Sequence, residues 1–415
     1  MIKDLSQKIR EKKPLLEEWF HSRMRGLPGA EPPIYSSVDL RNAGFKMAVV
    51  DTNLFPAGFN NLCETFSENG SHAFRTFLDT WHADVRRILI FPEEHTRNLY
   101  YWQNIVALRK ILISAELEVE IGSSSTLFPQ DPYVVPIEGA DPVIIHKVFL
   151  ENQKLRTSDF VPDLILLNND LSTGTPDYLK DLQQTILPSP HLGWYRRRKS
   201  DHFRHYQRLI EDISKIIEID PWHLSTLSAV ETGIDLTDQI CLKRLAEAAD
   251  RLLMRIRQKY LQYGIRREPY LFIKNDAGTY GLGVTHIDSG ASLLAMNRRT
   301  RNKLESSKGG RRVSEYLLQE GIPTADFYLG KPLEPIVYLV GGYPIGTFFR
   351  IHVEKNEMES LNTPGMSFAC LCLHKVEEQD ELYTVASFLG RVASLAAVCE
   401  LAGVHPLLPR VISAS

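Results

Sequence analysis

The chain has 415 residues, which is enough for two or three domains and a sizeable buried core. Its 48 lysines and arginines nearly balance 51 aspartates and glutamates, so no overall charge favours nucleic acid or an anionic membrane as a partner. The five cysteines are scattered and odd in number, which favours reduced thiols in a cytoplasmic protein. Composition therefore indicates an ordinary soluble globular protein.

The two ends of the chain are expected to be helices of a soluble protein. Residues 1–20 mix acids and bases and lack an apolar core segment, which predicts an amphipathic helix rather than a signal peptide. Near the other end, VASFLGRVASLAAVCELAGV is interrupted by Arg391 and Glu400, which favours a core helix over a membrane span.

The first half of the chain alternates strand-like and helix-like segments. KMAVVDTN, RRILIFPEEH, LEVEIGSS and PDLILLNNDLS each run from apolar to polar residues, and TRNLYYWQNIVALRKILISAEL is helical in pattern. This alternation predicts an α/β fold that begins with a doubly wound, mostly parallel sheet. Ligands bind beyond the carboxyl ends of such strands, so the polar clusters are the places to look for substrate contacts.

The texture changes around Pro188-Ser-Pro190, so we place a boundary there, with domains at 1–190 and 191–415. A basic run, WYRRRKSDHFRHYQ, opens the second half, and Arg196–Lys199 fits a solvated helix face better than a nucleic-acid patch. A phosphate contact inside a nucleotide site, through Lys199, is the main alternative. GRRVSEYLLQEG is expected to form a helix among the strands that follow.

A lysine followed by glycines marks the stretch YLFIKNDAGTYGLGVTHI. Its order, strand lysine and then G-x-x-G-x-G, fits neither the P-loop nor the dinucleotide fingerprint, and predicts a hairpin. Gly278, Gly281 and Gly283, together with Tyr280, would bring backbone amides close to a phosphate, and Lys274 would reach the same phosphates. The plainer alternative is a glycine-rich hairpin with an exposed lysine.

Three later features support a nucleotide site. Gln319 and Glu320 end the predicted helix, where a segment can present backbone groups to an adenine. Arg350 lies inside the apolar strand FFRIHVE, and a buried arginine requires an anionic partner. Asn362 follows in the loop SLNTPGM. The lysine, the glycine loop, the Gln319–Glu320 segment, the arginine and the asparagine therefore occur in that order.

This succession resembles the ATP-grasp superfamily of carboxylate–amine ligases. With VVDTNLFPAGFNN in the first half, the chain is similar to the proteobacterial glutamate–cysteine ligases of ATP-grasp type over roughly residues 46–403. The resemblance implies an ATP-grasp (α+β) domain in the second half, with ATP and Mg²⁺ as cofactors. It also implies ligation of the glutamate γ-carboxylate to cysteine through an acyl phosphate, the first step of glutathione biosynthesis, with Lys274 and Arg350 as the catalytic cations.

The chain differs from glutathione-synthetase-like enzymes at the expected metal site. Glutathione-synthetase-like enzymes carry Mg²⁺ ligands in a Glu-x-Asn on a last strand, whereas HPLLPRVISAS contains no acid. Glu359 and Asn362 are the nearest replacements, so we predict them as metal ligands. Another carboxylate–amine ligase and an inactive nucleotide-binding protein remain alternatives, and the oligomeric state, including a homo-oligomer, is left open.

The loop after MAVV is the predicted amino-acid site. Asp51 offers a carboxylate for an α-ammonium group, and Asn53, Asn60 and Asn61 offer amides for carboxylate oxygens, alongside Arg350. We expected the loop to follow a parallel strand. The alternative is an Asx-rich turn that caps the next helix.

Overall fold

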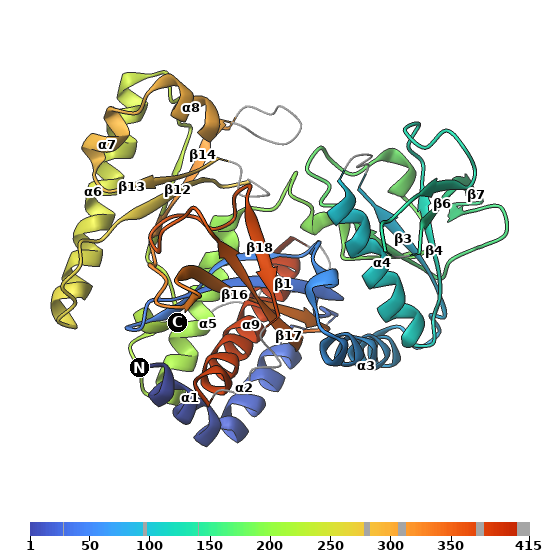
Figure 1. The fold of residues 1–415 in the computed structure, drawn as a ribbon, viewed down its shortest axis with the longest axis horizontal. Helices are drawn as coiled ribbons and strands as arrows, with labels where there is room; N and C mark the ends of the chain where they lie inside the picture. Colours follow the sequence, from blue (N-terminus) through green and yellow to red (C-terminus); the bar gives the residue numbers. More distant parts are fainter. Residues whose placement is uncertain are drawn as a thin grey trace.

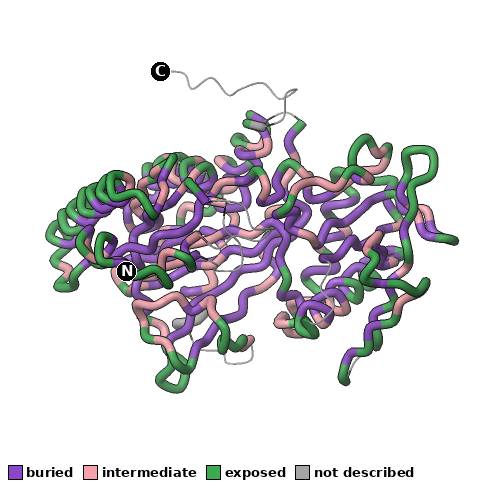
Figure 2. Tube along the Cα trace, turned by 90° about the horizontal axis from the view of Figure 1, so that it is seen from above, coloured by how far each residue is buried: buried purple, intermediate pink, exposed green. Residues whose placement is uncertain are grey.

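The structure is a computed structural model that describes residues 1–27, 29–93, 98–139, 141–277, 283–305, 313–370 and 377–404. In these residues the fold is mixed α/β, with three sheets of four or more strands and one two-stranded hairpin (Figure 1). Buried residues run along the strands of all three sheets, while exposed residues gather on outer helices and loops (Figure 2).

The central sheet joins the beginning and the end of the chain. Its strands, in spatial order, are β18 (Met366–Ala369), β17 (Tyr343–His352), β16 (Lys331–Val340), β1 (Tyr35–Asn42) and β2 (Met47–Asn53), with β15 (Phe327–Tyr328) paired to β16. Every pairing in this sheet is antiparallel.

The expectation that MAVV lies in a parallel sheet is therefore wrong. Strand β2 pairs antiparallel with β1, and β1 pairs antiparallel with β16. An apolar run with a polar end fits either kind of sheet, and here the short connection from β1 to β2 makes the two strands an antiparallel hairpin. Since this sheet takes strands from both sides of residue 190, the division at that residue stays a prediction.

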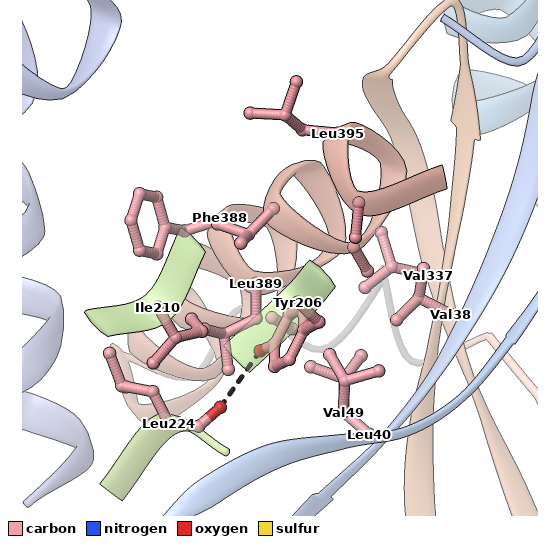
Figure 3. Close-up of a cluster of buried hydrophobic side chains, with 14 of the residues drawn as sticks. Val38, Leu40, Val49, Tyr206, Ile210, Leu224, Val337, Phe388, Leu389 and Leu395 are labelled. Atoms are coloured by element: carbon pink, nitrogen blue, oxygen red, sulfur yellow. Dashed lines mark hydrogen bonds between the residues drawn. The ribbon is translucent and has the colours of Figure 1, made fainter. Parts of the chain in front are cut away.

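Helices cover one face of the central sheet. They are α1 (Ile2–Glu11), α2 (Lys13–Arg25), α5 (Lys199–Ile217) and α9 (Glu377–Val404). Phe388 and Leu389 of α9 pack with Ile210 of α5 over Val38 and Val49 of the sheet (Figure 3).

One window within Asp380–Gly403, inside α9, is apolar and long enough to cross a membrane, but 78% of it is buried inside the protein. The expected core helix is thus observed. The expected N-terminal amphipathic helix is two helices, α1 and α2, and a proline lies in the first turn of α2.

A second sheet is the parallel one predicted from the sequence. Its order is β10 (Thr185–Leu187), β9 (Leu164–Asn168), β3 (Arg87–Pro92), β4 (Glu118–Ser123), β6 (Val143–Lys147) and β5 (Tyr133–Val135), and only β5 is antiparallel to its neighbour. Helices α3 (Glu64–Trp81) and α4 (Leu99–Ser114) and the hairpin β7 (Phe149–Glu151) and β8 (Lys154–Arg156) complete this part. The expected strands RRILIFPEEH, LEVEIGSS and PDLILLNNDLS are confirmed as β3, β4 and β9.

A third sheet has four antiparallel strands. They are β11 (Ser228–Thr232), β14 (Glu315–Glu320), β12 (Leu271–Asn275) and β13 (Val284–Ile287), with helices α6 (Gln239–Gln262), α7 (Gly290–Leu294) and α8 (Arg298–Glu305) alongside. Single turns of 3-10 helix occur at Phe59–Asn61, Asp177–Leu179, Pro190–Leu192 and Pro221–Leu224. The predicted hairpin of β12 and β13 is confirmed, with Lys274 opposite Val284.

The helix predicted for GRRVSEYLLQEG is wrong, because residues 315–320 form strand β14. Glu, Leu and Gln favour helices, but β14 lies between β11 and β12 and is hydrogen-bonded on both sides. All but the first of its residues are buried, and a central strand with both edges paired outweighs local helix propensity.

A buried ion pair ties the central sheet to the four-stranded sheet. Lys46, just before β2, donates from Nζ to Glu320 Oε2 at 2.9 Å, and both side chains are 0% exposed. Trp222 Nε1 also donates to Glu320 at 3.1 Å, and its ring lies 4.1 Å from Lys46 Nζ. The backbone N–H of Leu227 donates to the same carboxylate, so the buried Glu320 has several hydrogen-bond donors besides Lys46.

Removing one partner of this pair should destabilise the protein strongly. Lys46→Met leaves the Glu320 carboxylate buried without a counter-ion, so we expect a loss of about 3–5 kcal/mol in the free energy of unfolding. Chemical denaturation measures it, and Lys46→Met with Glu320→Leu should recover most of the loss. Lys12→Met, which removes a more exposed pair with Glu218, is the matched control and should change stability by less than about 0.5 kcal/mol. Equal effects of the two single variants would contradict this view of the pair.

Candidate functional site

The face of the central sheet opposite α9 carries charged side chains. Successive strand residues point to opposite faces, so Val38 and Leu40 of β1 pack on the helices while Asp39 and Arg41 face the other way. The same alternation places Glu334 of β16 and Arg350 of β17 on that charged face.

These four residues form one buried ion-pair cluster. Arg41 Nε lies 2.8 Å from Glu334 Oε2, Arg350 Nη1 lies 2.8 Å from Asp39 Oδ2, and Arg350 also donates to Glu334. Burial alone would raise the pKa of Glu334, yet Arg41 and Arg350 lower it. Burial opposes the charge of Arg350 too, but Asp39 and Glu334 raise its pKa. Burial raises the pKa of Asp39, although Arg350 opposes this, so the two carboxylates of the cluster shift in opposite directions.

Two lysines reach the same region from other elements. Lys274 of β12 donates from Nζ to the Val50 carbonyl at 3.0 Å and to Gln319 Oε1 at 2.6 Å. Burial lowers the pKa of Lys274 to about 8, although Asp51 opposes this. Lys199, in the first turn of α5, pairs with Asp51 at 2.5 Å. Burial would raise the pKa of Asp51, but Lys199 and Lys274 lower it to about 2.

Two adjoining pockets open between these elements. The first has about 650 Å³ of space, part of it open to solvent, and its lining includes Arg41, Val50, Lys199, Phe272, Lys274, Gln319, Glu320, Ile322 and Glu334. The second has about 840 Å³, and its lining includes Asn53, Phe55, Asn61, Asp170, Trp194, Ile336, Tyr338, Phe348 and Arg350. Asp39, Asp51 and Asn362 line both pockets.

Most predicted site residues that the structure describes lie on these pockets. Lys199, Lys274, Gln319 and Glu320 line the first, and Asn53, Asn61 and Arg350 line the second, with Asp51 and Asn362 common to both. Gly283 lies next to β13 with φ +66°, a conformation that favours glycine. Gly278, Tyr280 and Gly281 lie outside the described residues.

Two predicted site residues, Asn60 and Glu359, line neither pocket, and part of the basic run is buried instead of solvated. Asn60 is exposed and lines neither pocket. Glu359 pairs with Lys355 at 2.9 Å and likewise lines neither. The solvated helix face predicted for Arg196–Lys199 is wrong for Arg197 and Lys199, which are buried, because tertiary contacts engage them.

Sequence reasoning missed Asp39, Arg41 and Glu334. A signal is present in the sequence, since Asp39 and Glu334 each lie between apolar neighbours in the strands SSVDLRN and PLEPIVYLV, and Arg41 follows Leu40 two positions after Asp39. A charge at an inward position of a strand needs a partner, so it marks a site or a buried ion pair.

Among the described residues, no group of three or more His, Cys, Asp and Glu side chains is arranged to hold a metal ion. The carboxylates of Asp39, Asp51 and Glu334 are each engaged by an arginine or lysine. The site thus consists of one pocket lined by both acidic and basic side chains and a second pocket beside it that is polar and partly apolar.

A charged pocket built across antiparallel strands and joined to a second, partly apolar pocket defines a candidate ligand site of an α/β protein. Residues 6–401 match the family "Glutamate-cysteine ligase", so the chain belongs to that family and is a ligase that joins glutamate to cysteine. No curated protein matches the chain.

A solved structure agrees with this assignment. A protein of Methylobacillus flagellatus KT, assigned as a gamma-glutamylcysteine synthetase, shares 36% identity with a TM-score of 0.88, over 97% of this chain and 96% of that one. D-alanyl-alanine synthetase A of Vibrio cholerae gives 11% identity and a TM-score of 0.35, over 75% of this chain and 81% of that one. A glutathione synthetase-like effector of Globodera pallida gives 11% and 0.31, over 84% and 81%. The last two likenesses are too distant to support any argument.

The affinity of the first pocket for a polyanion should fall as pH rises through 8. Lys274 is cationic below its pKa of about 8 and neutral above it, so the attraction is present at low pH and is lost at high pH. We expect the Kd of a non-hydrolysable ATP analogue to weaken roughly tenfold between pH 7 and pH 9, with proton uptake on binding near pH 8. Calorimetry in buffers of different ionisation enthalpy measures both.

Lys274→Arg is the control for this titration, because an arginine stays charged throughout the range. The variant should bind with a flat profile over pH 7–9. An unchanged profile in the variant would assign the titration to another group, such as Lys46, whose pKa burial also lowers to about 8.

Proposed function

We propose that the first pocket binds ATP, that the second binds glutamate and cysteine, and that the reacting carboxylate lies against the wall shared by both. This assignment gives the chain an ATP-grasp arrangement, with nucleotide held between the four-stranded sheet and the central sheet. The observation that carries it is the shared wall of Asp39, Asp51 and Asn362, which lets a phosphoryl donor and a carboxylate acceptor approach each other.

The cations of the first pocket support a nucleoside triphosphate as its ligand. Lys274, Lys199 and Arg41 approach it from the four-stranded sheet, from α5 and from the central sheet. Phe272 and Ile322 add apolar surface suited to a base. Gly278, Tyr280, Gly281 and Gly283 remain the predicted loop over the phosphates, and Gln319 and Glu320 remain predicted contacts of the nucleotide.

The second pocket supports amino acids as its ligands. Asn53 and Asn61 offer neutral amides and Asp170 a carboxylate, which suits an α-carboxylate and an α-ammonium group. Phe348 and Ile336 offer apolar surface for methylene groups and a thiol. Arg350 lies on the side of the pocket that carries Asp39, where it would neutralise the carboxylate under attack.

The chemistry needs positioning and charge neutralisation more than covalent help. A γ-carboxylate oxygen of glutamate attacks the terminal phosphorus, and ADP leaves with the electrons of the broken P–O bond. The amine of cysteine then attacks the acyl carbon, phosphate leaves and the amine loses a proton. Lys274 and Arg350 stabilise the charge that develops on transferred oxygens, the role for which fixed cations are most effective.

Mg²⁺ fits the oxygen donors of the shared wall. Magnesium is held by one or two carboxylates together with substrate phosphates, so it needs no preformed cage of three acids. Asp39, Asp51 and Asn362 would hold it, and it would neutralise phosphate charge. Asn362 therefore stays in the proposed set, whereas Glu359, which lines neither pocket, is the weaker of the two predicted ligands. A cytoplasmic location remains a prediction.

Asn61→Ala should impair glutamate use without affecting ATP binding. The variant removes one amide from the second pocket, which should raise the KM for glutamate about three- to tenfold, the cost of one hydrogen bond. Steady-state kinetics measure this, and calorimetry with the ATP analogue should be unchanged. Asn60→Ala, the exposed neighbour, is the matched control and should behave as wild type. Asp51 is unsuited to this test because it lines both pockets. Wild-type kinetics for Asn61→Ala would remove Asn61 from the substrate site.

The two predicted metal residues should separate in a magnesium titration. Asn362→Ala should raise the Mg²⁺ concentration that half-saturates binding of the ATP analogue about tenfold, because it removes an oxygen donor near the phosphates. Glu359→Gln should leave it unchanged. Calorimetric titrations at several Mg²⁺ concentrations measure both without relying on turnover, and the opposite ranking would restore Glu359 as the ligand.

A further inference from the structure

The basic run has a second feature that its predicted role does not explain. Residues 194–200, here called the joint segment, connect the parallel sheet to α5 and contact all three sheets of the protein. The Trp194 N–H donates to the carbonyl of Asp170, which follows the parallel strand β9 and lines the second pocket. Residues 197–200 of the joint segment contact the central sheet and the four-stranded sheet.

Toward the central sheet, the joint segment holds the backbone of the shared wall. Arg197 Nη1 donates to the carbonyl of Thr52 at 2.6 Å, and Arg197 is itself fixed by two bonds to Glu400 of α9 at 2.9 and 3.2 Å. Thr52 lies between Asp51 and Asn53, and Lys199 pairs with Asp51. A shift of the segment would therefore move Asp51.

Toward the four-stranded sheet, the joint segment binds the residue that follows β12, the strand that carries Lys274. The Lys199 N–H donates to the carbonyl of Asp276 at 2.9 Å, and the Ser200 N–H donates to the Asp276 carboxylate at 2.8 Å. Asp276 directly follows β12, the strand of Lys274. Arg198 Nε lies 2.5 Å from Glu315 Oε2, at the start of β14.

We propose that Arg198 and Glu315 are positioning residues that couple ATP binding under the four-stranded sheet to glutamate binding in the second pocket. Neither lines a pocket, so the pair can affect the substrates only through the placement of the sheets. ATP drawn to Lys274 fixes the four-stranded sheet, the pair passes that placement to the joint segment, and Lys199 and Arg197 set Asp51 and Asn53. Binding free energies coupled in this way are reciprocal.

The inference rests on the two-pocket assignment above, and its test separates the two. Calorimetry gives the Kd of the non-hydrolysable ATP analogue with and without saturating glutamate, and the ratio is the coupling. In Arg198→Gln and in Glu315→Gln the ratio should fall about two- to fivefold, the range for a partly exposed pair. The double variant should lose no more than either single one, because the two act together.

Arg196→Gln is the matched control, because Arg196 carries the same charge in the same run but is exposed, and its side chain meets His191 rather than either sheet in the described part of the chain. Its coupling ratio should equal that of wild type. A wild-type ratio of one, an unchanged ratio in both pair variants, or an equal loss in Arg196→Gln would each overturn the proposal. Failure of the analogue or of glutamate to bind wild type at all would instead overturn the two-pocket assignment. Unchanged melting temperatures across the three single variants confirm that the ratio, rather than folding, is what changed.

Discussion

Buried charge must be compensated, and this constraint organises the site. The described residues that line the two pockets include the carboxylates of Asp39, Asp51, Asp170, Glu320 and Glu334 and the cations of Arg41, Arg350, Lys199 and Lys274. Three of the cations have carboxylate partners within ion-pair distance. Lys274 is instead held by two neutral oxygens, and its pKa is lowered by burial. Lys274 is therefore the lining cation that an anionic ligand can meet without separating an ion pair.

The site exists only where distant parts of the chain meet. Asp39 and Asp51 come from β1 and β2, whereas Glu334 and Arg350 come from β16 and β17, and the antiparallel pairing of β1 with β16 places them on one face. Lys274 arrives from a different sheet, tied to the central one by Lys46 and Glu320. The relative placement of the sheets is therefore as much a part of the site as its side chains.

Local structure could be predicted from the sequence, whereas strand pairing between distant segments could not. The hairpin around Lys274 and the parallel strands β3, β4 and β9 could be predicted, because each depends on residues close together in the chain. The strand β14 could not, since its residues favour a helix and only its two neighbours hold it extended. Asp39 and Glu334 carry a local signal, a charge inside an apolar strand, but their partners Arg350 and Arg41 lie on other strands, so the cluster itself depends on long-range pairing.

Asp51 connects these observations in a single residue. It pairs with Lys199, lies in the wall common to both pockets, and is held ionised by two lysines. On the proposed assignment, a divalent cation arriving with ATP would compete with Lys199 for this carboxylate. Lys199 released from Asp51 would then be free to meet phosphate oxygens, so that one exchange of partners would place the metal and a second cation around the phosphates at once. On this assignment substrate binding would exchange the partners of these ion pairs, and each buried group would keep a partner throughout.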